Sequence, residues 1–98
     1  MMKIVKKVEG NELTISIEGR LDFSTTPKLE EELAFLDGIE KVIFDFEKLE
    51  YISSSGLAVI LKFKKKVNAI KIINCNPEVL EILNITGFSG IMDVEVNH

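Results

Sequence analysis

The chain has 98 residues, of which 46% are hydrophobic and 29% are charged. This length and balance are typical of one globular domain with a single core, and they exclude a disordered chain. The formal net charge of −4 argues against nucleic acid as the main partner, because nucleic-acid binding depends on a basic surface that neutralises phosphates.

The chain begins with a predicted β-hairpin. Residues 3–9 and 12–19 are rich in β-branched side chains. The second segment alternates apolar and polar residues, as a strand with one covered face does. Gly10 and Asn11 between the two segments are typical of a two-residue hairpin turn.

A helix and two strands are predicted next. Thr26 followed by Pro27 indicates an N-cap with proline at the first helical position. Three leucines then recur at i, i+4 and i+7 and define one apolar stripe; they are Leu29, Leu33 and Leu36. Asp37-Gly38 should end this helix, and residues 41–46 and 51–53 should form strands.

The second half of the chain repeats the alternation of helix and strand. Residues 54–67 have helical spacing, with apolar positions on one broad side; these are Leu57, Ile60, Leu61, Phe63 and Val67. A strand is predicted over 69–74, and a short helix begins at Asn76-Pro77 with Val79, Leu80 and Leu83 facing inward. Residues 91–96 should form a last strand at an edge of the sheet.

Strands that alternate with helices of about three turns predict crossover connections and a largely parallel sheet. The first hairpin is antiparallel, so the sheet should be mixed. We therefore expect one α/β (α+β-like) domain over residues 1–98. It should have about five strands, with three to four helices packed mainly on one face.

The titratable residues do not indicate an enzyme. Cys75 is the only cysteine, which excludes an intramolecular disulfide and a metal centre built on thiolates. His98 is the only histidine, and the last residue of a chain is a poor position for a general base or a metal ligand. We expect no catalytic residue, cofactor or metal. Residues 1–10 lack a continuous apolar run and the longest such run, 57–61, cannot span a bilayer, so we expect a cytoplasmic protein without a membrane partner.

Three serines and a glycine stand where a strand passes into a helix. A helix has one N-cap, so Ser53 or Ser54 can satisfy its free N–H groups while Ser55 remains in or just before the first turn. A phosphoryl group on that hydroxyl would lie against the positive end of the helix. Gly56 leaves the surrounding surface open to close approach.

Other chemistry at these serines is disfavoured. A hydrolase nucleophile elbow needs glycines two residues before and after the serine, where this chain has Ser53 and Leu57, and no internal histidine can act as base. The lysines of residues 62–66 lie at least two helical turns away. No glycine-rich run ends in Gly-Lys-Ser/Thr, so a phosphate-binding P-loop is absent as well.

The run "SSSGLAVIL", preceded by an aromatic–aliphatic pair, resembles the signature of the STAS domain in single-domain bacterial anti-sigma factor antagonists. A second mark of that family, Gly-x-Leu/Ile-Asp after the second strand, is matched by "GRLD" at 19–22. The order of predicted elements agrees from about residue 3 to residue 96. The family's usual Asp, two residues before the phosphoacceptor, is replaced here by Ser53.

The resemblance implies a regulatory switch. The unmodified protein would bind an anti-sigma factor, a serine kinase of the GHKL type, and so release a sigma factor. Phosphorylation of Ser55, with Ser54 as the alternate acceptor, would end that binding until a phosphatase restores it. The residues expected at the partner interface are Asp22, Phe23, Ser24, Ser53, Ser54, Gly56, Leu57 and Ala58. A monomer is favoured, and Asp22 has the alternative role of making a local turn bond.

A second hypothesis keeps the fold without the switch. The helix start would then bind a small anion, a nucleotide or a lipid head group, or the domain would serve as a subunit of a larger regulatory assembly. Taken from their loop positions alone, Phe23 and Phe88 are expected to cover the core, with partner contact as the alternative if a ring is exposed. The lysine-rich segment 62–66 is expected to be a solvated helix face, with a docking patch for an acidic partner as the alternative.

Overall fold

The computed structural model describes residues 2–96, so His98 lies outside the described residues. The strands are β1 (Met2–Glu9), β2 (Glu12–Leu21), β3 (Lys41–Asp45), β4 (Leu49–Ile52), β5 (Ala69–Cys75) and β6 (Asp93–Val96). The helices are α1 (Thr26–Glu30), α2 (Ser54–Lys66) and α3 (Pro77–Ile85), with 3₁₀ helices η1 (Glu31–Phe35) and η2 (Phe88–Gly90). Within residues 2–96, no helix has the length and apolar character needed to cross a membrane.

One mixed sheet contains all six strands. Its order is β1-β2-β3-β5-β6, and β4 pairs with β2. β1 and β2 form the expected antiparallel hairpin, and the remaining pairs are parallel. The sheet has one strand more than the approximate number expected, because all six segments predicted as strands join it, including the short β4, which pairs only with β2.

The junction between β3 and β4 depends on a glycine. The first half of β2 pairs with β3, ending where Ser16 lies opposite Asp45. β2 then pairs with β4, beginning where Gly19 lies opposite Leu49, and residues 46–48 connect the two strands. Gly19 has φ +96°, a conformation that side chains with a Cβ rarely adopt, and its N–H donates to the Lys48 carbonyl over 3.0 Å. The glycine of "GRLD" therefore permits the irregularity that brings β4 beside β2.

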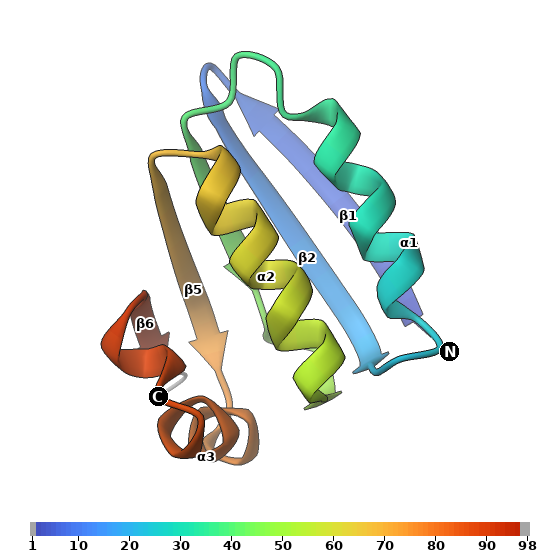
Figure 1. The fold of residues 1–98 in the computed structure, drawn as a ribbon, viewed down its shortest axis with the longest axis vertical. Helices are drawn as coiled ribbons and strands as arrows, with labels where there is room; N and C mark the ends of the chain where they lie inside the picture. The colour runs from blue at the N-terminus through green and yellow to red at the C-terminus, as the bar shows by residue number, and fades with distance from the viewer. Residues whose placement is uncertain (1, 97–98) are drawn as a thin grey trace.

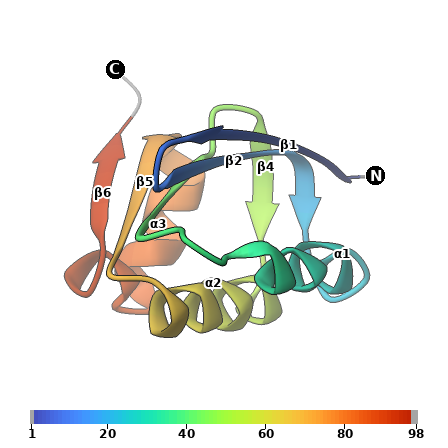
Figure 2. The same cartoon turned by 90° about the horizontal axis from the view of Figure 1, so that it is seen from above.

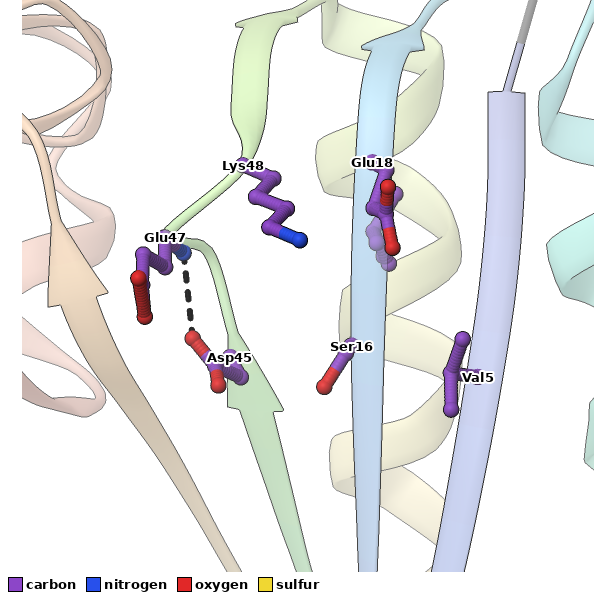
Figure 3. A pocket seen from close by; sticks show the side chains of 7 residues that line it. Val5, Ser16, Glu18, Asp45, Glu47 and Lys48 are labelled. Atoms are coloured by element: carbon purple, nitrogen blue, oxygen red, sulfur yellow. Dashed lines mark hydrogen bonds between the residues drawn. The ribbon is translucent and has the colours of Figure 1, made fainter.

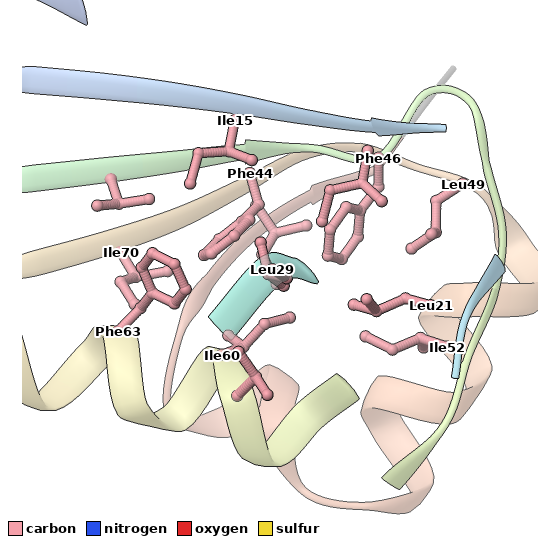
Figure 4. Packing of buried hydrophobic residues seen from close by; sticks show 14 of the residues in the cluster. Ile15, Leu21, Leu29, Phe44, Phe46, Leu49, Ile52, Ile60, Phe63 and Ile70 are labelled. Carbon is pink, nitrogen blue, oxygen red and sulfur yellow. The ribbon is translucent and has the colours of Figure 1, made fainter. Parts of the chain in front are cut away.

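The helices α1 and α2 lie side by side over one face of the sheet (Figures 1 and 2). Between the two layers, the Phe44 ring meets Phe63 of α2 edge-on, with centroids 5.2 Å apart, and also lies near Phe46 (Figure 4). Val59 of α2 is buried while Leu61 is half-buried, which corrects the predicted apolar side of this helix. The helical period thus turns Val59 rather than Leu61 toward the sheet.

The predicted N-cap is correct for α3 but not for α1. α1 has Thr25 rather than Thr26 as its N-cap, and Thr26 is buried in the first turn. α3 begins as predicted: the Asn76 side chain accepts from the Val79 N–H over 2.8 Å, and its amide donates to the Leu49 carbonyl over 2.9 Å. These two bonds fasten α3 to β4 at the end of the sheet.

Candidate functional site

The two sequence motifs meet at one edge of the sheet. β2 and β4 are parallel, and Leu21 lies opposite Ile52 at their carboxyl ends. The Ser53 N–H donates to the Leu21 carbonyl over 2.9 Å, so the chain segments that follow the two strands leave the sheet together. We call these segments, residues 22–24 and 53–55, the serine rim.

Ser53 is the N-cap of α2. Its Oγ accepts from the Gly56 N–H at 3.4 Å and lies 2.7 Å from the Ser55 Oγ. Ser54 is the first helical residue and is exposed, whereas Ser55 is half-buried. Both candidate phosphoryl acceptors therefore lie in the first turn of a 13-residue helix, and neither residue is fully buried.

Gly56 brings the start of α2 against the strands. A Cβ at this position would lie 2.9 Å from Leu21 Cγ and 3.0 Å from Ile52 Cγ1, and both of those side chains are fully buried. Real Cβ atoms essentially never approach other atoms this closely. The absence of a side chain at Gly56 thus sets how near the serines stand to the carboxyl ends of β2 and β4.

Asp22 makes the local turn bonds that were the alternative to a partner contact. Its Oδ1 accepts from the Ser24 Oγ at 2.6 Å and from the Ser24 N–H at 3.0 Å. The Ser24 hydroxyl is the main cause that lowers the pKa of the Asp22 carboxyl. The Asp22 carbonyl also accepts from the N–H groups of Thr25 and Thr26, so the turn after β2 is fixed on both sides.

This turn exposes Phe23 on the rim. The ring is 82% exposed, so the prediction that Phe23 covers the core is wrong. Phe88, by contrast, is partly buried and packs against the core, as predicted. The difference arises because the bonds of Asp22 hold the loop in a tight turn whose one large apolar side chain projects outward. A large exposed aromatic ring is typical of an interaction site.

Not every residue expected at the interface is accessible to a partner. Leu57 is only 3% exposed and belongs to the core, and Gly56 is buried. These two residues therefore do not contact a partner directly; instead, they fix the position of the start of α2 against the strands. Ala58 is exposed one turn beyond Ser54, on the outer side of α2.

The sequence did not single out the residues that support the rim. Thr25 accepts from the Asp22 N–H over 2.9 Å and donates to the Arg20 carbonyl over 2.8 Å. The Arg20 guanidinium lies 4.4 Å from the centre of the Tyr51 ring across the β2–β4 pair. The spacing Asp-x-x-Thr in "DFST" was the available signal for the Thr25 bond, whereas the Arg20–Tyr51 contact depends on the register of the two strands.

Two other features were considered as sites. A hollow of about 310 Å³ lies on the sheet face opposite α2, lined by Val5, Ser16, Glu18, Asp45, Glu47 and Lys48, none of which belongs to the serine rim (Figure 3). Cys75 is buried, and desolvation raises its thiol pKa to about 11, so this thiol is not activated. Neither feature adds a reactive group to the rim.

Comparison with known proteins identifies the family. Residues 3–98 match the family model described as the STAS domain. The anti-sigma-B factor antagonist of Staphylococcus aureus is 28% identical over 86 residues, covering 82% of this chain and 80% of that protein.

Two solved structures share the fold. An anti-sigma factor antagonist from Mycobacterium paratuberculosis superimposes with a TM-score of 0.87 at 17% identity, covering 97% of this chain and 86% of the other. SpoIIAA of Bacillus, a cell fate determinant solved in its phosphorylated form, has a TM-score of 0.70 at 18% identity, covering 96% of this chain and 90% of the other.

Proposed function

This chain belongs to the STAS domain family, and on that premise we propose that it is an anti-sigma factor antagonist switched off by phosphorylation of Ser55. The observation that carries the proposal is the convergence of both motifs at one edge of the sheet. The Ser53 N–H bond to the Leu21 carbonyl joins the serine run to the "GRLD" turn. A partner that covers one segment must therefore meet the other.

Ser55 is favoured as the acceptor because of its position in the first turn of α2. The free N–H groups there and the helix dipole stabilise negative charge. The Ser55 Oγ is held by the Ser53 Oγ at 2.7 Å, which restricts its rotamers and presents one orientation to a kinase. Ser54 is more exposed and has no such restraint among the described residues, so it is the alternate acceptor.

A phosphoryl group adds roughly two negative charges at neutral pH. Within an interface these charges must lose their water, and they repel acidic groups of the partner. Phe23, 82% exposed on the same rim, supplies the apolar anchor that a complex would bury. Binding and its loss are thus both assigned to the serine rim.

The remaining parts of the proposal follow from the resemblance. The partner is an anti-sigma factor that is itself a serine kinase of the GHKL type, and a phosphatase resets the switch. The relatives named above are antagonists, which are regulatory binding proteins rather than enzymes. We propose that this chain acts in the same way, as a monomer in the cytoplasm.

Phosphorylation by a candidate kinase tests the proposal. The unmodified chain, incubated with the anti-sigma factor kinase of the same cell and ATP, should gain the mass of one phosphate. Ser55→Ala should abolish the gain, and Ser54→Ala should retain it. Incorporation only at Ser54 would reassign the acceptor. No incorporation with a kinase that phosphorylates its own control substrate would contradict the switch.

Binding provides the second readout. Ser55→Asp should weaken association with the anti-sigma factor, whereas Ser55→Ala should preserve it. A thermal-shift screen with nucleotides and anions addresses the non-switching hypothesis. A large shift with one such ligand, together with no binding to any anti-sigma factor, would favour that hypothesis.

A further inference from the structure

The outer face of α2 leads from the serine rim to a cluster of lysines. Ser54, Ala58, Leu61 and Lys65 follow one another at i, i+4, i+7 and i+11 and therefore lie along one stripe of the helix. Three of them are exposed, and Leu61 is half-buried. We call this stripe the α2 ridge; it belongs to a helix that lies over one face of the sheet (Figures 1 and 2).

The far end of the ridge is basic in a chain that is acidic overall. Four of the 12 basic residues fall within 62–66, although the net charge is −4. No acidic residue occurs between Glu50 and Glu78. Lysines are therefore the only charged residues from position 51 to position 77, and four of these five lysines lie in the second half of α2.

Neighbouring acids neutralise only part of this cluster. Glu30 of α1 forms an ion pair with Lys62. Among the described residues, Lys64, Lys65 and Lys66 have no acidic partner within salt-bridge distance, and all three are exposed. Glu40, whose carbonyl accepts from the backbone N–H of Asn68 just beyond α2, has a carboxylate that accepts hydrogen bonds from the side chains of Asn11 and Asn68.

Helix stability explains these lysines only in part. A cation in the last turn interacts favourably with the helix dipole. Lys62 and Lys66, however, are like charges at i and i+4, an arrangement that destabilises a helix. One lysine would supply the favourable term without this repulsion, so a run of three consecutive unpaired lysines exceeds what the helix end requires.

We propose that the docking surface extends from the serine rim along the α2 ridge to Lys64, Lys65 and Lys66, and that the partner presents an acidic surface to these lysines. The inference rests on the proposed function, because it concerns the anti-sigma factor that would bind the rim. A helix of 13 residues is about 20 Å long. A standard interface covers about 800 Å² per partner, or about 30 Å across, so one partner spans both ends.

This arrangement separates attraction from switching. Lys65 lies ten residues beyond Ser55, which is about 15 Å along the helix axis. Charges so far apart at the surface are largely screened from each other, since the Debye length is about 8 Å at physiological ionic strength. A phosphoryl group on Ser55 therefore blocks contact at the rim but leaves the lysines positive.

Association kinetics with the kinase identified by the phosphorylation assay test the inference. The triple variant Lys64→Gln, Lys65→Gln, Lys66→Gln should associate about tenfold more slowly at low ionic strength, because electrostatic steering raises association rates by about 10–1000-fold. The difference should vanish at high salt, and the dissociation rate should change little. The matched triple replacement by Arg keeps the charges and should associate at the wild-type rate.

A charge-matched control identifies the location of the effect. The triple variant Lys3→Gln, Lys7→Gln, Lys48→Gln removes the same charge from exposed positions on β1 and the β3–β4 connection. It should associate at least five times faster than the α2 variant. Equal rates for the two variants would overturn the inference while leaving the proposed function intact. A wild-type chain that binds no anti-sigma factor would overturn the proposed function, and the inference with it.

Discussion

Replacing Gly56 by Ala tests whether close packing fixes the start of α2. The added methyl group would meet Leu21 Cγ at 2.9 Å and Ile52 Cγ1 at 3.0 Å. Leu21 and Ile52 are 0% and 1% exposed and are enclosed by the core, so neither can move aside freely. The first turn of α2 must then shift outward, or the core must repack.

Two terms of opposite sign determine the expected magnitude. Overpacking a core costs about 1–3 kcal/mol of unfolding free energy. Alanine is intrinsically better than glycine within a helix by up to about 1 kcal/mol. The net expectation is a loss of about 1–2 kcal/mol, which lowers the Tm of a domain of this size by about 5–10 °C.

Urea unfolding followed by circular dichroism measures the change. Ala58→Gly, on the exposed side of the same helix, calibrates helix propensity alone. In a double-mutant cycle, Leu21→Ala removes two of the three close contacts, those with Leu21 Cγ and Cδ2, so Gly56→Ala should cost less in that background than in the wild type. If Gly56→Ala instead stabilises the protein by as much as Ala58→Gly destabilises it, the packing argument is refuted.

Three further predictions concern single side chains. Phe23→Ala should reduce affinity for the anti-sigma factor at least about tenfold while changing stability by less than about 0.5 kcal/mol. Phe35 is also exposed but lies on η1, so Phe35→Ala should leave the affinity unchanged, and equal losses of affinity in the two variants would refute the role of Phe23. The Cys75 thiol should react with a disulfide reagent far more slowly in the native protein than in urea. Because folding raises its pKa from 9.0 to about 11, the contribution of this thiol to stability should be fully present below pH 9 and should be lost as the pH rises through 11. The pKa of Asp22, followed by NMR titration, should rise toward its ordinary value in Ser24→Ala; the native group contributes stability above its ordinary pKa that is lost as the pH falls through the lowered one, and an unchanged pKa in the variant would exclude the Ser24 hydroxyl as the cause.

Local sequence signals predicted most of the fold. Alternating β-branched residues identified the hairpin, and Asn76-Pro77 identified the start of α3, because these signals act over a few residues. The N-cap of α1 was misplaced by one residue, since two adjacent threonines precede Pro27 and only the bonds of Thr25 to Arg20 and Asp22 distinguish them. The choice between Thr25 and Thr26 as the N-cap thus depended on the hydrogen bond of Thr25 to Arg20, five residues earlier in the chain.

The candidate site was predicted in its position but not in its details. The motifs at 19–22 and 53–56 placed the serine rim at a strand end, because both follow apolar strands. The exposure of Phe23 could not be read from composition, since of the two aromatic residues expected in loops, Phe23 is exposed while Phe88 packs against the core. The helical spacing had placed Leu57 on the apolar side of α2, and its burial agrees with that placement rather than with the partner contact implied by the resemblance.

The short contact between Ser53 and Ser55 gives modification a direct local effect. The two hydroxyl oxygens lie 2.7 Å apart, so one hydroxyl donates its own proton to the other, and either can be the donor in the native protein. Esterification would strip the proton from the Ser55 oxygen, which could then only accept. Ser53 would become the sole donor of the pair while still receiving the Gly56 N–H. The amide resonance of Gly56 is consequently a built-in reporter of whether the neighbouring alcohol is free.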